Sequence, residues 1–214
     1  MKVLMIQKVK GIGGSEIYFT QMLPALLKSG VKVEFVSVRK PKDGTEPLEL
    51  IEKLRNSGVK VYDLVVNSIY SPTLLLKLNR IIKSNKYDIV HSHLIHADFW
   101  IALVDIFFKK QYMHLSTKHG YDEAYMNHNG LNATNIRSNL YFRISKFSEK
   151  FIDYSFAVSE GLRQFYIDAK ICNGDKIGVI KHGFELPPVQ GKENNKFRYS
   201  KNQVVIVGRL IPLK

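Results

Sequence analysis

The chain has 214 residues, of which 45% are hydrophobic and 11% aromatic, a composition that suits a folded globular protein and excludes a disordered one. Its single cysteine, Cys172, excludes an internal disulfide framework and any zinc knuckle of several cysteines. The formal net charge of +13 needs a partner such as nucleic acid, an anionic membrane surface or a phosphorylated substrate, unless the basic surface only aids solubility.

Strand-like and helix-like runs alternate along the chain. Strands are predicted at 2–7, 31–38, 59–66, 87–93, 112–120, 154–159 and 176–183, and the helices between them at 15–30, 46–58, 71–86, 96–110, 136–153 and 160–168. Pro24 is expected to kink or break the first helix, and Gly30 to end it. The alternation predicts right-handed crossovers and an α/β fold, a Rossmann-like parallel sheet with helices on both faces.

The character of the chain changes after Phe184. Residues 185–202 are polar and contain adjacent prolines, which is typical of a linker, and 203–214 are strand-like again. We therefore predict a Rossmann-like domain at 1–184, a linker at 185–202, and at 203–214 the first strand of a second domain whose remainder is absent.

Ligands of such a fold bind at the carboxyl ends of the strands. The residues expected there are Gly11 to Glu16, His91, His93, Lys118 to Gly120, Ser159, His182 and Gly183.

The loop "GIGGSE" at 11–16 precedes the first helix, which Ser15 could cap. Backbone N–H groups at a helix start bind anions, and glycine lets a phosphate approach closely. Glu16 stands where the dinucleotide fingerprint has its third glycine, and the second strand ends in Arg39 and Lys40 instead of an acid. NAD binding is therefore disfavoured, while an unliganded tight turn stays open.

The segment "HSHLIH" places His91 and His93 on one face of a strand, with His96 close by. Three histidines can hold zinc, but no acidic or cysteine ligand stands beside them. We favour histidines that pack at a strand end, and we expect no metal.

Two predicted helices carry basic side chains opposite an apolar stripe. They are Lys77, Arg80, Lys83 and Lys86 in one, and Arg137, Arg143, Lys146 and Lys150 in the other, the latter with Tyr141 and Phe142 interleaved. Basic amphipathic helices suit an anionic membrane surface, although lysines in water beside a buried stripe explain them equally. No nucleic-acid-binding motif is present. Without a secretory signal or a bilayer-spanning segment, we expect a cytoplasmic protein, peripheral at the inner face of the membrane.

Six motifs occur in the order in which family 4 glycosyltransferases have them: "GGSE", "DIVHSH", "STKHG", "AVSEGLRQ", "VIKHG" and "VGRLIPLK". The chain resembles that family over essentially its whole length. The resemblance implies a retaining enzyme of GT-B fold, represented here by its N-terminal, acceptor-side domain and the first strand of the donor-side domain.

The resemblance also implies roles for individual residues. His119 would face the donor sugar as the catalytic residue, and Glu16, His93 and His182 would lie nearby in the cleft. Gly13, Gly14, Arg209 and Lys214 would bind the donor diphosphate. The chain departs from the family at "HGFE", where the family often has Asn-Gly before an aspartate, so the contacts of His182 and Glu185 are open.

The function so implied is transfer of a sugar from a nucleotide-diphosphate sugar to a hydroxyl on a glycan or lipid-linked acceptor, in cell-envelope polysaccharide or lipopolysaccharide synthesis. No cofactor or metal is expected, and the chain alone should have little activity. Two alternatives are a non-catalytic basic domain on an anionic membrane and a Rossmann-type nucleotide-binding protein.

Overall fold

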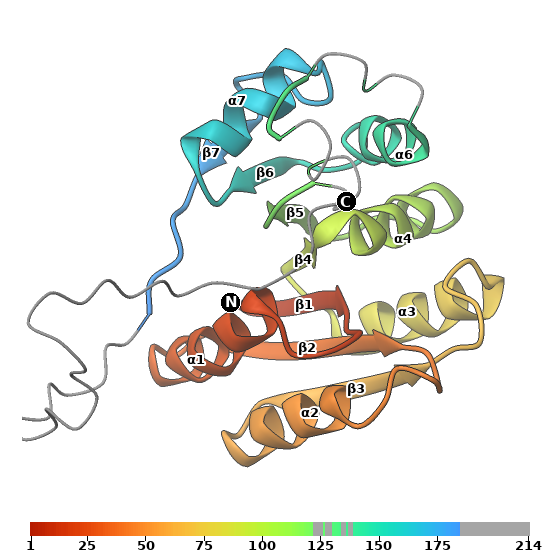
Figure 1. Cartoon of the computed structure of the whole chain (residues 1–214). Helices are drawn as coiled ribbons and strands as arrows, with labels where there is room; N and C mark the ends of the chain where they lie inside the picture. Colours follow the sequence, from red (N-terminus) through yellow and green to blue (C-terminus); the bar gives the residue numbers. More distant parts are fainter. Residues whose placement is uncertain (122–125, 127–129, 134–135, 137–138, 185–214) are drawn as a thin grey trace, which may run out of the picture. The chain divides into compact units, whose positions relative to one another are not determined.

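The computed structural model describes residues 1–121, 126, 130–133, 136 and 139–184 (Figure 1). The predicted linker at 185–202 and the strand at 203–214 lie outside them and stay predictions. The described strands are β1 (Lys2–Lys8), β2 (Lys32–Arg39), β3 (Lys60–Val65), β4 (Ile89–His93), β5 (Met113–Lys118), β6 (Tyr154–Ala157) and β7 (Ile177–Val179). The described helices are α1 (Gly14–Lys28), α2 (Glu46–Asn56), α3 (Pro72–Asn85), α4 (Leu94–Phe107), α6 (Leu140–Ser148) and α7 (Glu160–Asp168).

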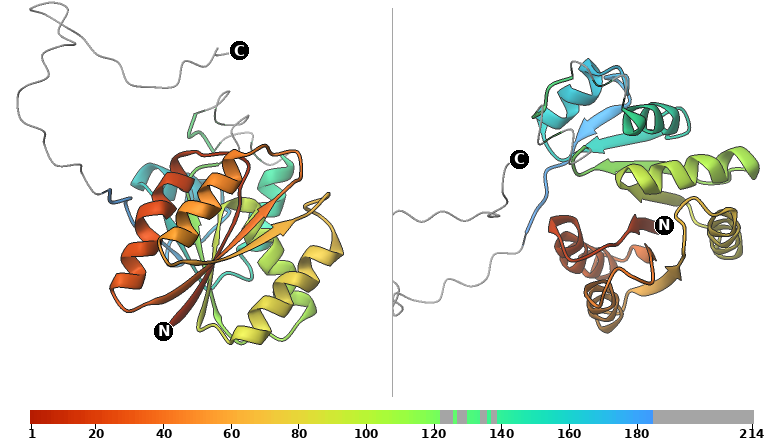
Figure 2. Two further views of the ribbon diagram at one scale, coloured as in Figure 1. Left: turned by 90° about the horizontal axis from the view of Figure 1, so that it is seen from below. Right: turned by 45° about the vertical axis from the view of Figure 1, so that its right-hand side comes forward.

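All described strands run parallel in one sheet, in the order β3-β2-β1-β4-β5-β6-β7. β1 lies inside the sheet, where it pairs with β2 from Lys2 opposite Lys32 onward and with β4 from Val3 opposite Ile89 onward. The sheet twists along this order (Figure 2). The Rossmann-like parallel architecture predicted from the sequence is confirmed.

Each face of the sheet is buried under its own helices, because successive side chains of a strand point to opposite sides. From β1, Leu4 and Ile6 pack with apolar residues of α3 and α4. Val3 and Met5 pack instead with residues of α1 and α2, which lie on the other side of the sheet (Figure 1). A third cluster joins α7 to β6 and β7. The helices thus cover both faces of the sheet, so a ligand would bind at the ends of the strands.

The helix boundaries follow local chemistry. Gly30 ends α1 with a φ of 82°, and Val31 N–H then bonds back to the Leu26 carbonyl oxygen. The predicted break at Pro24 is wrong, since α1 continues through it. The helix predicted at 136–153 spans only Leu140–Ser148, because the Asn139 side chain caps it by accepting from the Tyr141 N–H at 2.8 Å.

Candidate functional site

The carboxyl ends of the parallel strands meet at one edge of the sheet, as such a topology requires. The glycine loop follows β1, His93 ends β4, His119 follows β5 directly, and His182 lies just beyond β7. Six predicted site residues therefore share this edge: Gly13, Gly14, Glu16, His93, His119 and His182. Arg209 and Lys214 lie outside the described residues, so their roles stay predictions.

Glu16 holds the glycine loop together from inside. Its side chain is buried, with one oxygen accepting from the Gln7 amide at 2.5 Å and the other from the Gly13 N–H at 3.0 Å. The Ser15 hydroxyl donates to the same carboxylate at 2.9 Å. The sequence suggested Ser15 as the cap, but Gly13 occupies the cap position, and Glu16 reaches back to accept from its N–H.

A second carboxylate reaches the loop from α2. Glu46 accepts from the Ile12 N–H at 3.0 Å, and a Cβ on Gly11 would lie 2.7 Å from the same oxygen, so a larger residue there would make this carboxylate shift. In the part of the chain that the structure describes, no group accepts from the N–H groups of Gly14 and Ser15. These N–H groups are the anion-binding capacity that the loop retains.

Positive charge lies beside the loop, at the ends of β1 and β2. Burial, the positive charge of Lys40 and that of Lys10 lower the pKa of Lys8, while Asp43 acts in the opposite direction. The same lysines act on His96 in the first turn of α4, whose pKa falls to about 4 through burial and then through Lys8 and Lys40. The loop and these side chains together form a surface on which a negative ligand would be favoured.

Three histidines form a hydrogen-bonded chain at the centre of this edge. His93 Nδ1 lies 2.9 Å from His119 Nε2, and His119 Nδ1 lies 3.1 Å from His182 Nε2. Burial, and the charge that neighbouring histidines would carry, lower the pKa of His119 to about 4 and hold that of His93 well below its ordinary value. Burial also lowers the pKa of His182. All three rings are therefore neutral at pH 7.

The other histidines of "HSHLIH" point elsewhere. His91 bonds to Thr117 Oγ1 at 2.8 Å and stacks on His93 with 4.4 Å between ring centroids. His96 packs near Trp100 instead, because the backbone turns through a left-handed φ of 68° at Leu94. Among the described residues, no group of three or more metal-binding side chains could hold an ion.

Sequence reasoning missed the network that fixes β5 next to His119. Lys118 is buried with its Nζ 2.6 Å from Asp98 of α4 and 2.5 Å from Glu149 after α6. Burial opposes its charge, but the two carboxylates outweigh it and raise the pKa of Lys118. Hydroxyls of Ser92 and Ser116 also donate to Asp98. A lysine in a strand gives no sequence signal of such burial.

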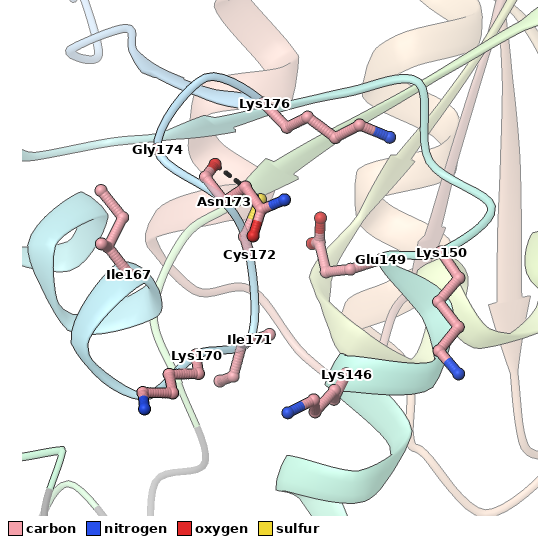
Figure 3. A pocket seen from close by; sticks show the side chains of 10 residues that line it. All are labelled: Lys146, Glu149, Lys150, Ile167, Lys170, Ile171, Cys172, Asn173, Gly174 and Lys176. Carbon is pink, nitrogen blue, oxygen red and sulfur yellow. Dashed lines mark hydrogen bonds between the residues drawn. The ribbon is translucent and has the colours of Figure 1, made fainter.

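A basic pocket lies at the other end of the sheet, away from the glycine loop. It has a volume of about 620 Å³ and is lined by Lys146, Lys150, Lys170 and Lys176, from the end of α6 and the segment between α7 and β7 (Figure 3). Phe142, which is interleaved with these basic residues in the sequence, is buried and does not contribute to the surface. The lysines of this region thus surround a hollow instead of flanking exposed aromatics.

Comparison with known proteins shows which family and which solved structures this chain resembles. A family model described as Glycosyltransferase Family 4 matches residues 12–186. No curated protein matches the sequence. None of the described helices combines the length and the hydropathy needed to cross a membrane.

Solved structures share the fold at low identity. Anabaena Alr3699/HepE, solved in complex with UDP, is 15% identical over 86% of this chain and 45% of its own, with a TM-score of 0.62. The lipopolysaccharide outer core galactosyltransferase WaaB is 15% identical over 88% and 48%, with a TM-score of 0.63. A putative UDP-N-acetylglucosamine 2-epimerase from Listeria monocytogenes is 17% identical over 83% and 44%, with a TM-score of 0.58. The chain therefore spans less than half the length of these proteins.

Proposed function

Since that match covers residues 12–186, the chain belongs to glycosyltransferase family 4, and we propose that it is the acceptor-side half of a retaining enzyme. The enzyme would move a sugar from a nucleotide-diphosphate sugar to a hydroxyl acceptor. The observation that carries the proposal is the meeting of the glycine loop and His119 at the carboxyl edge of one sheet. UDP in the HepE structure supports a nucleotide-sugar donor.

The chemistry follows from the charge of the leaving group. As the bond from sugar to diphosphate breaks, negative charge grows on the phosphate oxygens, and aligned N–H groups and cations stabilise it. The N–H groups at Gly14 and Ser15 would contribute from this half. Arg209 and Lys214 would contribute from beyond the described residues. His119 would contact the sugar, and the departing phosphate would accept the acceptor's proton, so that neither metal nor cofactor is needed.

We place the reaction in cell-envelope polysaccharide or lipopolysaccharide synthesis, with glycan or lipid-linked acceptors on the cytoplasmic side. The family and the likeness to WaaB support this setting. The test is to delete the gene and to profile envelope glycans by mass spectrometry. We expect a glycan to lose a sugar, and wild-type protein but not His119→Ala to restore it. An unchanged glycan profile would contradict the proposal.

The isolated chain should turn over little donor, because it spans less than half of the solved relatives. Robust transfer by the purified chain would refute this part. UDP-N-acetylglucosamine 2-epimerases share the fold, so the assay should follow the sugar by NMR, which separates epimerisation from transfer. Tight binding of NAD instead of UDP would favour the Rossmann-type nucleotide-binding alternative.

A second partner is an anionic membrane surface, favoured by the lysine pocket in Figure 3. Lysines near anionic headgroups contribute about 1 kcal/mol each. Sedimentation with phosphatidylglycerol vesicles should fall when Lys146, Lys150, Lys170 and Lys176 are changed to glutamine. The matched control changes four exposed lysines elsewhere on the protein, Lys28, Lys32, Lys53 and Lys109, to glutamine. Equal loss of vesicle binding in both variants would indicate that net charge alone causes the binding. If wild type does not bind the vesicles, the membrane surface is refuted as a partner.

A further inference from the structure

The hydrogen-bonded row of His93, His119 and His182 has one buried end and one accessible end. The His93 side chain is 1% exposed, whereas those of His119 and His182 are partly exposed. His119 Nδ1 lies 3.1 Å from His182 Nε2, and the two ring planes differ by 24° with 5.0 Å between their centroids. The hydrogen-bonded row of histidines therefore leads from the interior toward the surface.

Counting protons fixes the direction of these bonds. Each contact between two nitrogens holds one hydrogen, so three neutral rings have only two arrangements. His93 Nε2 is buried, and no described group lies within hydrogen-bonding distance of it. A buried N–H without an acceptor costs more than a buried lone pair, so the hydrogen of His93 lies on Nδ1. His93 then donates to His119, and His119 donates from Nδ1 to His182.

His119 consequently has no ring nitrogen to spare. Its Nε2 accepts from the buried His93, and this hydrogen bond cannot be broken without opening the core. Its Nδ1–H is held by His182, in the segment after β7 that forms no strand. Any ligand atom that bonds to the His119 ring must take the place of His182 Nε2, which lies 3.1 Å from His119 Nδ1.

We infer that His182 is a removable occupant of a sugar subsite, and that donor binding displaces it from the Nδ1–H of His119. This rests on the proposed function. The group that replaces it must be a hydrogen-bond acceptor, such as a hydroxyl oxygen of the transferred sugar. The ring of Tyr18, 4.0 Å from His182 between centroids, stays behind as an apolar wall against which a sugar ring can pack. His93 is the positioning residue that keeps the donor hydrogen on the outer side of His119.

The first experiment measures the bonds themselves. Long-range proton–nitrogen NMR of the histidine-labelled chain should show His93 and His119 protonated on Nδ1, with scalar coupling between nitrogens across both contacts. His93→Asn, whose amide can donate from the same position, should keep His119 protonated on Nδ1. His93→Phe should lose this tautomer. Protonation of His119 on Nε2 in the wild type would overturn the inference.

The second experiment uses imidazole as a probe of the vacated place. His182→Ala should bind imidazole saturably, with a shift of the His119 Nδ1–H signal, and wild type should not. His182→Gln keeps an acceptor in place, so it should resemble wild type and serves if His182→Ala folds poorly. Absence of imidazole binding in a folded His182→Ala chain would overturn the inference. Because neither readout needs transfer, glycan profiles that refute the proposed function would leave these results unchanged.

Discussion

Lowering the pH from 7 to 5 should destabilise this protein severely, because its histidines are buried in their neutral form. Burial, and then the charge that nearby His114 would carry, lower the pKa of His91 to about 3; the pKa of His96 and that of His119 are each lowered to about 4. In the unfolded chain the pKa of histidine is about 6.5. The stabilisation is therefore complete above pH 6.5 and is lost as the pH falls from 6.5 toward 4.

The magnitude follows from proton linkage. At pH 5 an unfolded histidine is almost fully protonated and these folded ones are almost wholly neutral, so each costs about 2 kcal/mol of unfolding free energy. The three together cost about 6 kcal/mol, which is comparable to the whole stability of an ordinary domain. His93, whose pKa burial also lowers, adds to this loss.

The charged groups around these rings do not reverse the direction in which stability changes with pH. His96 faces Lys8 and Lys40, which oppose its protonation. His119 faces His182, which opposes protonation, and Asp98, which favours it but is outweighed by burial. Asp98 already holds the ammonium of Lys118 at 2.6 Å. The net effect at each ring is a lowered pKa.

The assay is urea unfolding followed by the fluorescence of Trp100, which is buried, at several pH values between 7 and 5. The unfolding free energy should fall steeply, with a slope that corresponds to at least three protons bound on unfolding. His96→Phe should lower this slope by about one proton. A total change below about 2 kcal/mol between pH 7 and 5 would refute the reasoning, because one such histidine alone supplies that much.

Three further variants test individual contacts by urea unfolding or thermal melting. Lys118→Met should cost about 3–5 kcal/mol, because it leaves the carboxylates of Asp98 and Glu149 buried without their cation; a loss below 1 kcal/mol, as expected for a surface pair, would contradict this. Lys170→Gly should stabilise by about 1 kcal/mol, because Lys170 has a left-handed φ of 56° at the end of α7, and a lower melting temperature would contradict it. Glu16→Ala should cost about 1–2 kcal/mol through the lost hydrogen bonds from the Gly13 N–H and the Gln7 amide, and an unchanged midpoint would show that these bonds do not stabilise the fold.

The elements of this fold are predictable because they depend on local pattern. Runs such as Val3 to Ile6 have the hydrophobicity of a strand buried on both faces, and Gly30 marks a helix end by its left-handed backbone. The strand ends were predictable too, since parallel strands expose them at one edge, which is why His93, His119 and His182 were expected together.

The contacts among those residues were not predictable. His182 bonds to a side chain 63 residues earlier from a segment outside any strand, and no periodicity encodes such a pairing. Lys118 appeared as an ordinary strand residue, because its two buried carboxylates come from distant elements. Glu16 was expected to lie in the cleft, yet one of its oxygens is bonded to Gln7 of β1 and the other to its own loop. Partners that are distant in sequence decide what a polar residue does.

The inner position of β1 has a consequence for biosynthesis. β1 is made before the other described strands, yet one of its two neighbours, β4, begins only at Ile89. Until that segment is made, the apolar strand from Val3 to Ile6 has one unpaired edge, a template on which another nascent chain can add. Fragments that stop before Ile89 should therefore aggregate, and synthesis stalled in α3 should recruit chaperones more than synthesis stalled in α7, when β4 has left the ribosome.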